Sequence, residues 1–174
     1  MPDEPIQSID IAHETIGHIL TDRKVLRVPE NQRSYAWKRD HVNQLFKDFA
    51  PLPKEYFLGS IVVVGKPSSI EVHDGQQRIA TAMILIAAIR DCFLSLGDEG
   101  SATQTESDFL WAHNRRTHEI LPRFTLNNED NDYFVKRVLL RPTDASRKAL
   151  KKKDAIRESH DRIYDAAAEA DANR

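Results

Sequence analysis

The chain has 174 residues, of which 40% are hydrophobic and 30% are charged, and its formal net charge is −2. This length suffices for one domain with a real core or for a domain and a helical annex, and the small charge excludes a global attraction to nucleic acid or membrane. The single cysteine, Cys92, excludes an internal disulfide framework and a cysteine-rich zinc site. The polar start MPDEPIQSID does not resemble a signal peptide, and no apolar run reaches the roughly twenty residues of a membrane span. We therefore expect a soluble, cytoplasmic protein without a membrane partner.

The first part of the chain mixes helical and extended patterns. In order, these patterns predict a helix over residues 8–22 capped by Ser8 or Asp10, an extended segment over 24–29, a loop after Pro29, a helix over 38–50, a buried strand over 56–65, a partner strand over 69–75 and a long helix over 76–96. The last of these helices is apolar on nearly every side. We therefore expect the rest of the fold to wrap it.

The second part of the chain begins after a polar, glycine-containing stretch. Residues 97–108 predict a mobile loop that separates a first module, residues 1–96, from a mainly helical extension, residues 109–174. The extension also carries a short strand and an acidic, amide-rich turn. Its last thirty residues have helical propensity but few apolar anchors, so we expect a partner for them. That partner would be a further C-terminal domain or another subunit, including a second copy of this chain.

Four hydrogen-bonding side chains and a glycine stand where the long apolar helix begins. Asp74 and Gln77 fit a capping box, in which each side chain satisfies a backbone N–H of the first turn. That interpretation leaves Gln76 and Arg78 unexplained. Helix N-termini also bind anions, Gly75 would let a phosphate approach the backbone, and Arg78 would add a bidentate contact. In that case Asp74 would hold Mg²⁺ or orient a water, which the amides would position. The residues alone leave capping and phosphate binding open.

A second polar group follows Pro29. It interleaves Gln32, Arg33, Lys38 and Arg39 with the aromatic residues Tyr35 and Trp37. Cations among aromatics suit nucleic acid, through phosphate contacts and base stacking. The alternative is that the two aromatic side chains pack under the following helix and the charges are solvated. The two Gln-Arg pairs, at 32–33 and 77–78, each end an extended segment and would face one cleft.

Other candidate motifs are weaker. His13 and His18 are five residues apart, as are His113 and His118, so neither pair lies on one helical face as metal ligands would. Neither a phosphate-loop motif nor a nucleophile elbow occurs in the sequence. The basic run over residues 147–157 would suit contacts to a DNA backbone, but a solvated helix face is the commoner explanation.

Four blocks of the chain together resemble the GmrSD restriction endonuclease N-terminal domain family, also called domain of unknown function 262. They are VPENQRSYAWKRDHVNQLFKDF, YFLGSIVVV, VHDGQQRIATAMILIAAIRD and PRFTLNNEDNDYF, and the similarity runs from about residue 8 to about residue 140. The resemblance implies an α/β (α+β) fold, with a ParB/sulfiredoxin-like small sheet and packed helices followed by a helical annex. It also implies nucleotide hydrolysis, bacterial defence against phage through foreign or modified DNA, and a C-terminal nuclease domain. Members include the SspE-type proteins, which sense phosphorothioate DNA.

The resemblance assigns roles to residues of this chain. Asp74, Gln76 and Gln77 would be catalytic, with Asp74 also the Mg²⁺ ligand. Gly75, Arg78, Gln32 and Arg33 would bind the nucleotide, and Tyr35, Trp37, Lys38 and Arg39 would contact DNA. The chain departs from the family pattern in the residues RIATA after the motif, where a leucine-threonine-threonine pattern is common.

Two functions therefore follow as hypotheses. The first is a Mg²⁺-dependent NTPase that senses DNA, forming the N-terminal module of a restriction or anti-phage protein, with ATP, GTP and CTP equally suitable. The second is a non-catalytic, ParB-like module that binds DNA or protein. A nuclease acting by itself is disfavoured, because no second acidic cluster stands near Asp74. Phosphate release with Mg²⁺ and each nucleotide, with and without DNA, separates the first two.

Overall fold

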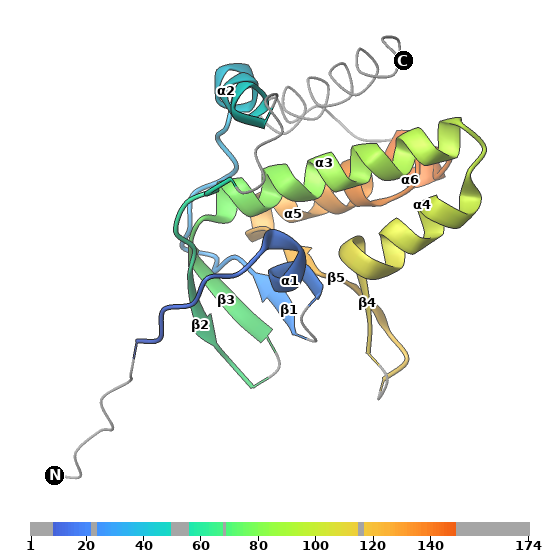
Figure 1. The fold of residues 1–174 in the computed structure, drawn as a ribbon. Helices are drawn as coiled ribbons and strands as arrows, with labels where there is room; N and C mark the ends of the chain where they lie inside the picture. Colours follow the sequence, from blue (N-terminus) through green and yellow to red (C-terminus); the bar gives the residue numbers. More distant parts are fainter. Residues whose placement is uncertain (1–8, 22–23, 50–55, 68, 115–116, 149–174) are drawn as a thin grey trace, which may run out of the picture.

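The computed structural model of the chain describes residues 9–21, 24–49, 56–67, 69–114 and 117–148. It has the mixed helix and strand content of an α+β fold, as predicted (Figure 1). In chain order the elements are α1 (Ile16–Thr21), β1 (Val25–Arg27), α2 (Arg39–Phe49), β2 (Val62–Gly65), β3 (Ser69–Asp74), α3 (Gln76–Ser95), α4 (Glu99–Thr105), the π-helical turn η1 (Glu106–Leu110), β4 (Trp111–His113), β5 (Ile120–Pro122), β6 (Phe124–Thr125), α5 (Asn128–Phe134), the π-helical turn η2 (Val135–Leu139) and α6 (Ala145–Lys148).

Four of the strands form one mixed sheet in the order β2-β3-β1-β6. Strand β1 runs parallel to both neighbours, with Leu26 opposite Ile70 on β3 and Phe124 on β6. Strands β2 and β3 are an antiparallel hairpin, and β4 and β5 form a separate two-stranded sheet. The extended segment at 24–29, the hairpin strand at 69–75 and the long helix that follows it are thus confirmed.

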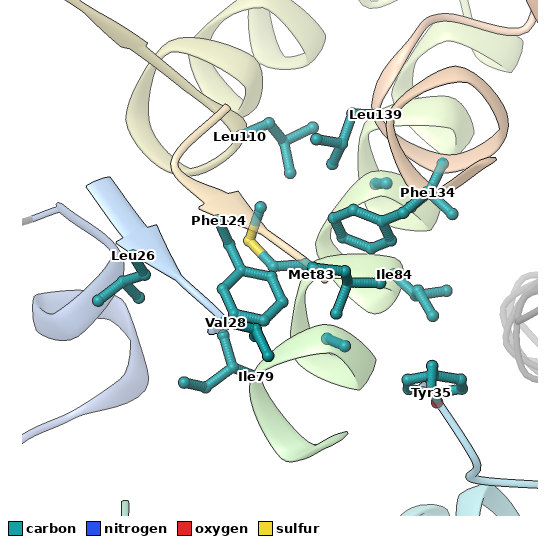
Figure 2. Close-up of a cluster of buried hydrophobic side chains, with 14 of the residues drawn as sticks. Leu26, Val28, Tyr35, Ile79, Met83, Ile84, Leu110, Phe124, Phe134 and Leu139 are labelled. Atoms are coloured by element: carbon teal, nitrogen blue, oxygen red, sulfur yellow. The ribbon is translucent and has the colours of Figure 1, made fainter. Parts of the chain in front are cut away.

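Helix α3 is the element around which the core is built. Of its side chains, Ile79, Met83 and Ile84 are completely buried. They pack with residues from nearly the whole described chain, among them Leu26, Val28, Tyr35, Leu110, Phe124, Phe134 and Leu139 (Figure 2). Because α3 is buried along most of its length, the prediction that the fold wraps it is confirmed.

The polar stretch after α3 is helical, which corrects the prediction of a mobile loop over residues 97–108. Asp98 caps α4 by accepting a hydrogen bond from the Ser101 N–H at 2.9 Å, and this cap lets a polar sequence start a helix. Backbone hydrogen bonding also lowers the pKa of the Asp98 carboxyl. Ala102 is fully buried, so one face of α4 is packed.

The boundary predicted between residues 1–96 and 109–174 does not separate two cores. Strand β6 lies beside β1 in the main sheet, and Phe124 and Phe134 pack edge to face with ring centroids 6.0 Å apart. Both rings belong to the same buried cluster as Leu26 and Met83. The described part of the extension therefore completes the first module, and the sequence beyond residue 148 lies outside the described residues.

Two early elements also differ from their predictions. The strand expected to be buried over 56–65 is β2, an edge strand whose residues are all exposed, because apolar composition alone does not distinguish an edge from a centre. The helix expected from residue 8 starts at Ile16, because the Thr15 hydroxyl accepts a hydrogen bond from the His18 N–H and caps it there.

A buried arginine anchors the far end of α3. Arg90 is 0% exposed, and its guanidinium donates to the Asp91 and Glu106 carboxylates at 2.6 and 3.1 Å. It also donates to the carbonyl oxygens of Val138, Leu139 and Leu140, at 3.1, 2.6 and 3.2 Å. These bonds use all the donors of the guanidinium and satisfy the carbonyl end of η2.

Further described features concern membranes and the cysteine. None of the helices in the described ranges is long and apolar enough to cross a membrane. Cys92 is partly buried on α3.

Candidate functional site

The polar cluster begins where β3 turns into α3. Gly75 has a φ of 91°, in the left-handed region that favours glycine, and a Cβ at this position would come within 2.9 Å of Ile61 Cγ1. It is the N-cap residue of α3, and no side chain caps this helix. The predicted capping box of Asp74 and Gln77 is therefore wrong: the glycine turn places Asp74 at the end of β3, with its side chain 61% exposed.

Gln77 points inward and braces the loop before α2. Its side-chain oxygen accepts from the backbone N–H groups of Ala36 and Trp37, at 2.7 and 3.2 Å, and its nitrogen donates to the Ser34 carbonyl at 3.3 Å. The residue is only 5% exposed. Its amide is thus occupied by the backbone of the loop, and the catalytic role predicted for Gln77 is not the one that this geometry gives it.

Gln76 links the start of α3 to the loop after Pro29. Its side-chain nitrogen donates to the side-chain oxygen of Gln32 at 3.4 Å, and Gln32 in turn donates to the His73 carbonyl at 3.2 Å. The expectation that the Gln-Arg pairs at 32–33 and 77–78 face one cleft stays a prediction, because this contact is made by Gln76, outside both pairs. The contact between the two amides is long, close to the limit for a hydrogen bond.

Arg78 lies over a glycine of the segment before β2. Gly59 has a φ of 108°, and a Cβ built there would overlap the Arg78 guanidinium. The guanidinium donates to the Leu58 carbonyl at 3.5 Å and to the Asp74 carboxylate at 3.4 Å, and its side chain is 22% exposed. Both contacts are long, so exchanging them for stronger bonds to a bound anion would sacrifice little.

The loop is braced on its other side by the start of α5. Asn127 donates to the Gln32 carbonyl at 2.9 Å, and Asp130 accepts from the Tyr35 N–H at 2.6 Å. Both residues are buried. The loop and the start of α5 enclose an open hollow of about 400 Å³, lined by Glu30, Gln32, Arg33, Ser34, Asn127, Asn128 and Glu129. One short loop thus connects the N-terminal ends of α3 and α5.

Tyr35 belongs to the core, which contradicts its predicted role in stacking on DNA bases. It is 5% exposed, and its hydroxyl forms a 2.8 Å hydrogen bond with the Thr81 hydroxyl of α3. Figure 2 draws its ring within the buried cluster. The sequence left this alternative open, and Gln77 and Asp130 decide it, because their bonds to the loop backbone hold the ring under the loop.

The remaining predicted DNA contacts have more access to solvent. Trp37 is half-buried, packs against the core and stacks on His41, with ring centroids 5.8 Å apart. Lys38 and Arg39 are exposed where α2 begins, and Arg33 is exposed beside the hollow. The structure thus places cations and one partly accessible ring on the surface near the cluster.

A protein-only metal site is not formed here. Within the described residues no group of three or more histidine, cysteine, aspartate or glutamate side chains is arranged to hold an ion. Asp74 alone offers a carboxylate at the cluster. One carboxylate is fewer ligands than a metal ion held by protein groups alone would need.

Sequence reasoning missed two sets of residues that position the site. The Arg78 guanidinium lies against Leu58 and Gly59. Gly59 could have indicated this contact, because an isolated glycine inside an apolar run often marks a close backbone approach. Asn127 and Asp130 hold the loop, but the amide-rich segment around them was interpreted only as a turn. Nothing in the sequence indicated that this segment would meet residues 32–35.

Comparison with known families now identifies the class of this domain. The model of the GmrSD restriction endonuclease N-terminal domain matches residues 16–173. The chain belongs to this family. The GmrSD match spans the sheet, the DGQQR cluster and α5, so every residue of the candidate site lies within it. Membership in the GmrSD family makes the chain a module of the restriction class, whose partner is DNA. No curated protein was found to match the chain.

Proposed function

We propose that the chain binds and hydrolyses a nucleoside triphosphate, and that it couples this activity to DNA as the N-terminal module of a restriction or anti-phage protein. The observation that carries the proposal is the start of α3, a 20-residue helix that begins at a left-handed glycine without a side-chain cap. Its positive end and first-turn N–H groups suit phosphate oxygens. Arg78, held only by long contacts, stands beside it.

The residues divide the work of binding. Arg78 and Arg33 would contact phosphate oxygens, while Gln32 and Gln76 would donate amide hydrogen bonds. Asp74 would hold Mg²⁺ together with the phosphates, and the ion would supply charge neutralisation to the transferring group. The nucleoside would extend toward the hollow beside Gln32 and Arg33. Gln77 has no part in this scheme beyond holding the loop.

The experiment compares two charge-neutralising variants. Arg78→Met removes the phosphate contact, and Lys47→Met removes an exposed cation from α2, outside the cluster. We expect Arg78→Met to weaken binding of ATP, GTP or CTP by about tenfold or more, because charge-assisted bonds contribute about 1.5–3 kcal/mol. Lys47→Met should bind as the parent does. Equal affinities in the two variants would exclude Arg78 from the site.

Hydrolysis is tested separately from binding. Asp74→Asn keeps the size of the side chain but removes the charge that would hold Mg²⁺. We expect phosphate release to fall strongly while the melting temperature changes little, since this side chain is exposed. Unchanged release would leave the alternative, a non-catalytic ParB-like module that binds DNA or protein; the ParB-like core itself stays a prediction from the family resemblance.

DNA sensing rests on the cations at the start of α2. Lys38→Ala and Arg39→Ala should weaken binding to duplex DNA and flatten its salt dependence, because each removed phosphate contact lowers the slope by about one counterion. Lys136→Ala, a cation paired with Asp132 on α5, is the control. Plain and phosphorothioate duplexes form the two arms of the titration. If the parent distinguishes phosphorothioate from plain duplexes and Trp37→Ala does not, the indole ring senses the modification. A C-terminal nuclease domain would then act on the DNA.

A further inference from the structure

The segment before α1 exposes large apolar side chains to solvent. Residues 9–15 form neither helix nor strand and are exposed throughout, with Ile9 and Ile11 at 90% and 92%. In Figure 1 this segment leads from α1 away from α3 and α4. Isoleucine side chains are rarely this exposed in a folded domain. The two alternate with Asp10 and Ala12, which is the pattern of a strand with one apolar face. We call residues 9–14 the arm.

The open edge of the main sheet is the second apolar surface. Strand β2 ends the sheet order, and Val62, Val63 and Val64 are 51%, 46% and 37% exposed. Neither a charge nor a proline stands in the strand. Of the protections that edge strands usually carry, only its short length and the bulge between Val62 and Val63 are present.

The register identifies which backbone groups of β2 face outward. The Lys66 N–H donates to the Ser69 carbonyl at 2.8 Å, so residues 66 and 64 face β3, where Val64 is opposite Glu71. Because backbone groups alternate along an antiparallel strand, the N–H and C=O of Val63 point to the open edge. Val63 therefore offers one donor and one acceptor to an added strand.

We propose that the arm of one copy adds to the β2 edge of a second copy, and that the reciprocal exchange forms a two-fold dimer. Six extended residues span about 20 Å, enough to cover the four residues of β2. The arm carries two carboxylates, Asp10 and Glu14, of which Glu14 pairs with His18, and no lysine or arginine. Strand β2 is followed by Lys66, which pairs with Glu71 at 3.6 Å and keeps a side chain 47% exposed. The arm points away from the rest of its own copy. When each arm pairs with the β2 edge of the other copy, both arms and both edges are covered and the assembly is closed.

Sedimentation equilibrium of the full chain over a range of concentrations tests the exchange. We expect a monomer–dimer equilibrium that both Ile9→Glu/Ile11→Glu and Val63→Pro shift toward monomer by about tenfold or more. Val63→Pro removes an outward N–H and leaves the bonds to β3 in place. Leu96→Glu, at a residue 64% exposed near the far end of α3, is the control and should dimerise as the parent does.

A mixture of the two variants separates this arrangement from its rivals. Val63→Pro keeps an intact arm, and Ile9→Glu/Ile11→Glu keeps an intact edge, so together they should form a heterodimer with one joint although neither forms a dimer alone. Association would fail to return if β2 paired with β2 or arm with arm. A parent chain that is monomeric at every concentration, or a dimer that persists in the arm variant, would overturn the proposal. Circular dichroism of each variant verifies its fold.

Discussion

The two ends of α3 carry similar residues but hold them very differently. At the start, Gln76 and Arg78 make contacts of 3.4–3.5 Å; Gln76 is buried, whereas Arg78 partly faces solvent. At the end, Arg90 makes contacts of 2.6–3.2 Å and is fully buried. A guanidinium with every donor satisfied has nothing left for a ligand, whereas one held by long contacts does. The length of the contacts, not the type of residue, distinguishes the two ends. We call the end at Arg90 the anchoring end and the end at Arg78 the receptive end.

The anchoring end is a network of charges. Asp91 also accepts from Arg147 at 3.0 Å, and Glu106 accepts from Arg141 at 2.7 Å. Burial lowers the pKa of the Arg147 guanidinium, while the hydrogen bonds to Glu106 raise the pKa of Arg141. The charges at this end compensate one another, so removing one leaves charge at this end that is only partly compensated.

The largest expected effect is from Arg90→Met. It takes from Asp91 and Glu106 one of their two arginine partners, and it removes the guanidinium that donates to the carbonyl oxygens of η2 and its C-cap. We expect a loss of about 3–5 kcal/mol in the free energy of unfolding, measured by urea denaturation. A loss below about 1 kcal/mol would show that this end of α3 does not anchor the fold.

The next effect concerns the inward face of the receptive end. Tyr35→Ala removes a buried ring and should cost about 3–5 kcal/mol, whereas Tyr35→Phe keeps the ring, removes the bond to Thr81 and should cost about 1 kcal/mol. Urea denaturation of both variants measures the difference. If Tyr35→Ala is as stable as Tyr35→Phe, the ring is not part of the core.

Asn127→Ala should have a smaller effect at the same end. It removes the cap of α5 and the bond to the Gln32 carbonyl, at an expected cost of about 1–2 kcal/mol. Because the loop then keeps Asp130 but loses Asn127 as a contact to α5, we also expect faster hydrogen exchange at the Tyr35 and Ala36 amides. Unchanged exchange would mean that Asn127 does not hold the loop.

The smallest change in stability is expected for Arg78→Met, the same substitution as at Arg90 but at the receptive end. Its ion pair with Asp74 is partly exposed and long, so we expect a change within about 1 kcal/mol. The comparison of the two variants is the direct test of how the ends differ. Equal losses in thermal denaturation would contradict it.

The sequence by itself determined the elements whose signal is local. The apolar run after Gly75 predicted α3, because a helix buried on most sides needs apolar residues at most positions. Gly75 marked the end of the partner strand predicted over 69–75, where β3 ends and α3 begins. These inferences needed no knowledge of distant partners.

Only the tertiary structure decided the roles of individual side chains. Gln76 and Gln77 are neighbours of the same type, yet the 100° turn between consecutive helical residues points one at Gln32 and the other at the loop backbone. The sequence placed Arg90 in an apolar helix and gave it no role. In the structure, three carbonyl oxygens at the end of η2 accept hydrogen bonds from it. Likewise β2 is an edge strand because the sheet extends from β3 through β1 to β6, on the side of β3 opposite β2. Each outcome depends on a segment distant in sequence, and a local pattern contains no information about which segment that will be.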